Sequence, residues 1–156
     1  MILSHRLQED LTQAIRDRDE LRRDTLRMVI AAAYNTQKAA GRELTDDEVI
    51  AVLSREVKTR RESIEAYAAA GRDEAAQREQ AEIDVVSTYL PAPLDEDELM
   101  SMVREAVEES GAASPRDLGR VMAVLVPRTR GRADGKQVSA AVARELAARD
   151  LATHGH

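Results

Sequence analysis

The sequence predicts an all-α protein, and three observations support that prediction. The chain of 156 residues contains no Phe, no Trp and only 3 Tyr, whereas strands favour aromatic and β-branched side chains. Alanine, leucine, glutamate and arginine, which have high helix propensities, are abundant instead. Apolar residues recur at helical spacing between capping and stop residues, and no segment alternates long enough to indicate a strand.

Four helices are expected in the first part of the chain. Leu7 and Leu11 lie on one stripe of the first helix. The second helix is expected over about residues 19–40, with Gly41 as its stop. Thr45-Asp46-Asp47-Glu48 forms a capping box that predicts the start of the third helix.

The third helix is expected to end at Gly71, and the fourth to begin at about Asp73 and to end before Pro91. A fifth helix is expected to open with acidic residues at Asp95 and to stop at Gly111.

The sixth helix is expected to begin at Ser114-Pro115, an N-cap followed by proline at the first helical position. We expect Pro127 to end it, a loop to cover residues 128–135, and a last helix to follow.

Pro91-Ala92-Pro93 is interpreted as a subdomain boundary. The predicted organisation is a bundle of about four helices over residues 1–92 and a smaller three-helix subdomain over residues 93–150. Residues 151–156 are expected to form a frayed tail.

Overall composition excludes several function classes. A formal net charge of -6 argues against general nucleic-acid binding, so any RNA contact must use a local basic patch. The absence of cysteine excludes disulfides, thiolate metal sites and cysteine nucleophiles. No apolar stretch approaches the length of a signal peptide core or a membrane span. We therefore expect a cytoplasmic protein with no membrane partner.

A local charge contrast marks the predicted second subdomain. Residues 95–114 hold seven acidic side chains and one arginine, whereas residues 115–137 hold six cationic side chains and two acidic ones. The six cations, called the basic set below, are the RNA-binding candidates: Arg116, Arg120, Arg128, Arg130, Arg132 and Lys136.

Several features would suit the basic set to a phosphate backbone. In an extended loop, alternate arginines point to one side. Gly131 and Gly135 would allow close backbone approach to a ligand, and the start of the last helix offers free N–H groups. The alternative is that the arginines are solvated or pair with the acidic fifth helix, while Asp134 caps the last helix.

No catalytic constellation is predicted from the residues. The segment from Gly131 to Gln137 departs from a P-loop in spacing, in its last residue and in having no preceding strand. All three histidines lie near the termini, so we expect no catalytic residue, no metal site and no cofactor. A second basic group on the third helix is interpreted as an exposed, ion-paired face: Arg55, Lys58, Arg60 and Arg61.

Five segments, in this order, resemble the GatB/YqeY family over about residues 1–150. They are Leu26-Arg27-Met28-Val29-Ile30-Ala31-Ala32, Gly41-Arg42-Glu43-Leu44-Thr45-Asp46, Ser63-Ile64-Glu65-Ala66-Tyr67, Tyr89-Leu90-Pro91 and Gly131-Arg132-Ala133-Asp134-Gly135-Lys136. The resemblance implies an all-helical protein related to the C-terminal tail of the B subunit of the glutamine-dependent aspartyl/glutamyl-tRNA amidotransferase. In that enzyme the tail contacts tRNA, and other domains and subunits perform the chemistry.

The resemblance implies an association with carbon–nitrogen ligase activity that uses glutamine as amide donor, and with translation. Because this chain corresponds only to the tail, we expect a tRNA-interacting accessory module without its own catalytic centre. The expected partners are tRNA or another structured RNA, and an amidotransferase or translation-associated protein. The alternative is a protein-interaction module with no RNA or ligase role.

Overall fold

The computed structural model describes residues 2–154, and the all-α prediction is confirmed within that range, which contains helices and no strand. The chain divides into two compact units, Met1–Pro91 and Ala92–His156. The division falls inside the Pro91-Ala92-Pro93 segment. Each unit has a hydrophobic core of its own.

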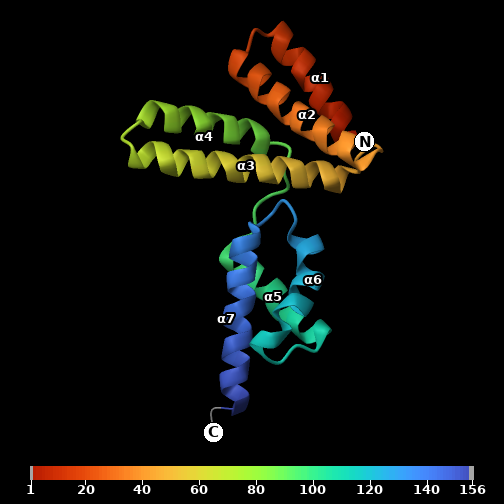
Figure 1. The fold of residues 1–156 in the computed structure, drawn as a ribbon, viewed down its shortest axis with the longest axis vertical. Helices are drawn as coiled ribbons and strands as arrows, with labels where there is room; N and C mark the ends of the chain where they lie inside the picture. The colour runs from red at the N-terminus through yellow and green to blue at the C-terminus, as the bar shows by residue number, and fades with distance from the viewer. Residues whose placement is uncertain (1, 155–156) are drawn as a thin grey trace. The chain divides into compact units, whose positions relative to one another are not determined.

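Unit 1 consists of two helical hairpins (Figure 1). The first pairs α1 (Ile2–Arg16) with α2 (Glu20–Ala40), and the second pairs α3 (Asp46–Ala69) with α4 (Asp73–Ser87). α2 packs against both α3 and α4, so the two hairpins share one core. Fully buried side chains from all four of these helices form the centre of that core: Leu7, Leu26, Val29, Leu53 and Val86.

Unit 2 is a three-helix arrangement in which each helix packs against the other two. It contains α5 (Glu96–Ser110), the short 3-10 helix η1 (Pro115–Asp117), α6 (Leu118–Thr129) and α7 (Gly135–His154). Its core draws aliphatic side chains from α5, α6 and α7: Val103, Val107, Val121, Leu125, Val142 and Leu146.

Local capping explains where most helices begin and end. The Thr45 side chain accepts a hydrogen bond from the Glu48 backbone N–H, and Asp95 does the same for Glu98. Gly41 and Gly111 follow α2 and α5 with a φ of 70°, a left-handed conformation that glycine adopts without a steric penalty. These starts and stops match the sequence analysis because they depend on neighbouring residues only.

Replacing Thr45 with alanine is expected to lower the free energy of unfolding of unit 1 by about 1 kcal/mol, because the Glu48 N–H at the start of α3 loses its acceptor. Urea denaturation followed by circular dichroism measures the loss. Thr59→Ala is the matched control, since Thr59 lies exposed in the middle of α3, where alanine is the better helix former. Equal effects of the two substitutions would refute a capping role for Thr45.

Three expectations about helical segments require correction. Pro127 does not end α6, which continues to Thr129. The missing N–H of Pro127 leaves only the carbonyl of Ala123 without its helical partner, and Ala123 is exposed to water. Residues 151–154, expected in a frayed tail, continue α7. Residues 155–156 of that expected tail lie outside the described residues.

The third correction concerns Arg60, expected on an exposed face of α3. Its side chain is only 4% exposed. It donates hydrogen bonds to Glu56 on the same helix at 2.8 Å and to Glu82 on α4 at 3.2 Å. One guanidinium nitrogen also lies 3.8 Å from the sulfur of Met28 on α2. Arg60 is therefore an internal ion-paired residue that connects three helices of unit 1.

Candidate nucleic-acid interface

The basic set extends from η1 along α6 and through the following turn to the start of α7. Arg116 lies in η1, and Arg120 follows one turn later near the start of α6. Arg128 lies in the last turn of α6, not in a loop as expected. It lies about 80° around the helix from Arg120, at about 100° per residue. Because Arg128 is helical and only Arg130 and Arg132 lie in the turn after α6, these three arginines do not share the extended loop that was expected.

Three members of the basic set pair with carboxylates in unit 2. Arg128 donates to Glu109 of α5 at 2.8 Å, and this contact raises the pKa of Arg128. Arg132 lies 3.7 Å from Glu98 at the opposite end of α5. Arg120 lies 3.9 Å from Asp117. The acidic fifth helix thus neutralises two of the six cations, as the alternative interpretation of the charge contrast proposed.

Arg132 also holds the turn before α7 against the start of unit 2. Its side-chain Nε donates to the carbonyl of Ala92 at 2.9 Å, and its own carbonyl accepts from the Leu94 backbone N–H at 2.9 Å. These contacts join segments that are far apart in the sequence. Because its guanidinium is committed to a backbone carbonyl and to Glu98, Arg132 is less available to a ligand than its charge suggests.

The remaining cations are Arg116, Arg130 and Lys136, called the unpaired cations below. All three are exposed. Across residues 2–154, no carboxylate lies within salt-bridge distance of their side chains. An exposed cation with no local partner keeps its full attraction for an external anion.

The start of α7 is less suited to a phosphate than its free N–H groups suggest. The Asp134 carboxylate accepts from the backbone N–H of Lys136 at 3.3 Å, so it caps the helix and places a negative charge there. Gly131 has a φ of 75°, so the left-handed conformation of the turn is enough to explain a glycine at this position. Gly135 is the first residue of α7, and a Cβ at that position would meet no atom within 4 Å. Neither glycine requires a ligand to explain it.

Asp117 is the acidic residue most firmly held beside the basic set. Its carboxylate accepts from the backbone N–H groups of Ala113 at 2.9 Å and Ser114 at 3.3 Å. These hydrogen bonds, the one from Ala113 foremost, lower the pKa of Asp117. Asp117 therefore stays ionised at neutral pH, where it organises the start of α6 and reduces the effective charge of Arg120.

Most members of the basic set are exposed, and the carboxylates around them belong to ion pairs and helix caps. The charged groups here are therefore guanidinium, ammonium and carboxylate groups. Across residues 2–154, no group of three or more His, Asp or Glu side chains is placed to hold a metal ion. No helix in the same range is long and apolar enough to cross a membrane.

The described residues form an all-α protein of two small helical units. Unit 2 carries the basic set, which α5 partly neutralises and which includes the exposed unpaired cations. The chain belongs to the Yqey-like protein family, whose sequence model matches residues 4–146. This family assignment agrees with the resemblance in the sequence analysis at the level of the YqeY family.

Three curated relatives carry the same name, "Altered inheritance of mitochondria protein 41, mitochondrial". The protein from Pyrenophora tritici-repentis is 30% identical over 128 residues, which cover 79% of this chain and 71% of the relative. The protein from Lachancea thermotolerans is 29% identical, over 54% of this chain and 46% of the relative. The protein from Eremothecium gossypii is 31% identical, over 58% of this chain and 49% of the relative. The chain thus spans about half the length of the latter two relatives.

Proposed function

We propose that this protein is an accessory module that contacts the phosphate backbone of a structured RNA, with tRNA as the expected ligand. The observation that carries the proposal is the presence of three exposed, unpaired cations within one small unit of an acidic chain. Residues 115–137, which carry the basic set, include no aromatic residue. This favours recognition of the RNA backbone and shape over base stacking.

Arg120, Arg128 and Arg132, which pair with carboxylates, would contribute less to phosphate binding than the unpaired cations. The Arg128–Glu109 pair is exposed on both sides, and exposed pairs of this kind are worth about 0–1 kcal/mol. Arg128 and Arg120 can therefore exchange a carboxylate for a phosphate at small cost. Arg132 also donates from its Nε to the Ala92 carbonyl, so its guanidinium is less free to reorient towards a phosphate.

The resemblance to the tail of the amidotransferase B subunit supports tRNA as the ligand and a carbon–nitrogen ligase assembly, with glutamine as amide donor, as the setting. In that setting the chain would supply contact with RNA while a partner protein supplies the chemistry. The cytoplasmic location stays a prediction. The relatives' names describe mitochondrial proteins, and tRNA is present in both compartments.

The test replaces the three unpaired cations together, as Arg116→Ala, Arg130→Ala and Lys136→Ala. Binding of unfractionated tRNA is measured by filter retention at salt concentrations from about 50 mM upward. Each lost phosphate contact lowers the slope of log affinity against log salt by about 0.7–0.9, so the slope should fall by about 2–3 units. Helicity should not change, because all three side chains are exposed.

The control removes the same number of positive charges from unit 1, as Arg55→Ala, Lys58→Ala and Arg61→Ala on α3. These side chains are also exposed. The control therefore separates local contact from the general effect of net charge. A wild-type chain that does not retain tRNA at about 50 mM salt, or two triple variants with the same slope, would refute the proposed interface.

A protein-interaction role remains the second candidate, and it has an observation of its own. An open apolar groove lies between α1 and α2 in unit 1, and none of the residues that line it belongs to the basic set.

A further inference from the structure

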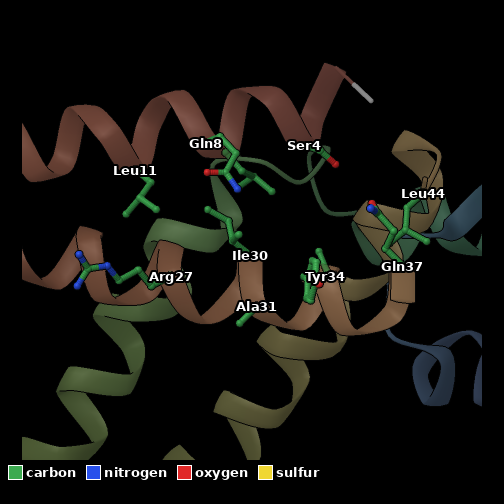
Figure 2. Close-up of a pocket in the computed structure, with 11 residues that line it drawn as sticks. Ser4, Gln8, Leu11, Arg27, Ile30, Ala31, Tyr34, Gln37 and Leu44 are labelled. Atoms are coloured by element: carbon green, nitrogen blue, oxygen red, sulfur yellow. The ribbon is translucent and has the colours of Figure 1, made fainter. Parts of the chain in front are cut away.

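The groove between α1 and α2, called the α1/α2 groove below, encloses about 410 Å³. Its apolar floor comprises Leu7 and Leu11 of α1, Ile30 of α2, and Leu44 of the loop before α3. Figure 2 shows the side chains of Leu11 and Ile30 projecting into the space between the two helices.

The lining residues follow helical spacing on both sides of the groove. On α1 they recur from Ser4 to Leu11, and on α2 from Arg27 to Gln37, at intervals of three and four residues. The stripe on α2 extends for about 15 Å at about 1.5 Å per residue. The stripe on α1 is shorter, about 10 Å, so the trough between the two ridges matches about two to three turns of a third helix.

The rim of the groove is exposed. Tyr34 is 62% exposed, and Gln8 and Arg27 are exposed as well. The groove is therefore open along its length, whereas small-molecule sites usually bury most of their ligand in a concave cavity. Exposed tyrosine beside an apolar floor is typical of residues that contribute most of the energy at protein interfaces.

The charge of the groove contrasts with the charge of its unit. Residues 1–91 hold 18 acidic and 14 basic side chains, yet none of the described residues that line the groove is acidic. Among residues 2–154, the one charged residue that lines it is Arg27. The nearby Asp24 feels the charge of Arg27 but forms its ion pair with Arg23 at 2.9 Å.

We propose that the α1/α2 groove binds an acidic amphipathic helix of a partner protein. Apolar side chains of that helix, spaced at i, i+3 or i+4 and i+7, lie on the floor formed by Leu11 and Ile30. A carboxylate on its flank pairs with Arg27. Gln8 and Gln37 supply hydrogen-bonding groups along the rim. The residues of this groove all belong to unit 1, so the groove shares no residue with the proposed RNA interface.

The test selects peptides on the full-length chain from a displayed library of amphipathic helices with randomised flanking positions. Wild-type protein should enrich helices with Asp or Glu at the flank that faces Arg27. The Arg27→Glu variant should enrich Lys or Arg at the same position, because the charge of the groove is reversed. Tyr34→Ala should weaken binding of the selected acidic peptide about tenfold or more.

Met28→Ala is the matched control, because Met28 is an exposed apolar residue of α2 that does not line the groove. It should leave the affinity of the selected peptide unchanged. Arg27 and Tyr34 are exposed, so their replacement should not alter unfolding by urea. Failure to enrich any helix, or enrichment without an acidic preference that Arg27→Glu reverses, would overturn the proposal. A dimer in sedimentation equilibrium that Tyr34→Ala dissociates would assign the groove to a second copy and would also overturn it.

Discussion

Replacing Arg60 with alanine is expected to lower the free energy of unfolding by about 3–5 kcal/mol, because it leaves a largely buried carboxylate without its cation. Glu82, the partner of Arg60 on α4, is only 12% exposed. Glu79 lies one turn earlier on the same helix, and its pKa is raised, first by burial and then by the charge of Glu82. Without Arg60, Glu56, Glu79 and Glu82 would share this region without the cation that pairs with Glu56 and Glu82.

The expected loss depends on pH in a defined direction. A carboxyl group whose pKa is raised by folding stabilises the folded state below that pKa and destabilises it as pH rises through it. The charge of Arg60 lowers the pKa of Glu79, so loss of Arg60 should raise that pKa further. The difference between Arg60→Ala and the wild type should therefore be largest at pH 7 and smaller at about pH 4, near the ordinary pKa of glutamate.

Urea denaturation at the two pH values measures this difference. Arg61→Ala is the matched control, since its side chain is exposed on the same helix and its loss should change stability by no more than about 0.5 kcal/mol. Adding Glu82→Gln to Arg60→Ala should restore part of the stability, because the stranded charge is removed. A loss below about 1 kcal/mol at pH 7 would mean that Arg60 behaves as an ordinary surface ion pair.

The burial of Arg60 shows where sequence reasoning stopped. Arg60 lies three residues after Val57 and four before Ile64, so the helical spacing of the apolar residues places it on the inner stripe of α3. The mixed charges around it favoured an exposed face instead. Spacing alone could have raised the possibility of burial. The identity of its partner on α4 could not be inferred, because it depends on how two helices pack.

Helix starts and stops were easier to predict from the sequence, because their causes are local. Thr45 and Asp95 cap the next residues in the chain, and Gly41 and Gly111 adopt left-handed conformations directly after a helix. The end of α6 was predicted wrongly because proline was expected to stop the helix. Pro127 lies in the last turn, where its missing N–H removes only the helical hydrogen bond to the Ala123 carbonyl.

The candidate site was predictable as a local concentration of charge, but its pairing was not. Sequence showed that acidic and basic segments follow one another, and it left open whether they meet. The structure brings Glu109 to Arg128 and Glu98 to Arg132, and it leaves Arg116, Arg130 and Lys136 unpaired among the described residues. Which cations remain exposed without a partner depends on the crossing of α5 and α6, which no residue pattern specifies.

Replacing Leu125 with alanine is expected to unfold unit 2 while unit 1 stays folded. Leu125 is fully buried in the core of unit 2, together with Val107 of α5 and Val142 of α7. A buried Leu→Ala substitution costs about 2–5 kcal/mol through lost burial and the cavity that remains. In a unit of fewer than about 70–80 residues, the hydrophobic core rarely contributes more than about 3–5 kcal/mol of stability. The loss is therefore comparable to the whole stability of this unit.

Amide hydrogen exchange on the full chain distinguishes the two units. In Leu125→Ala, protection of amides around Val107 and Val142 should fall towards that of an unfolded chain, while amides around Val29 should keep their protection. Leu53→Ala is the matched control, because Leu53 is equally buried in the core of unit 1 and should produce the reverse pattern. The two cores share no residue, so each substitution should act on its own unit. Equal loss of protection in both units after either substitution would show instead that the whole chain unfolds as one cooperative body.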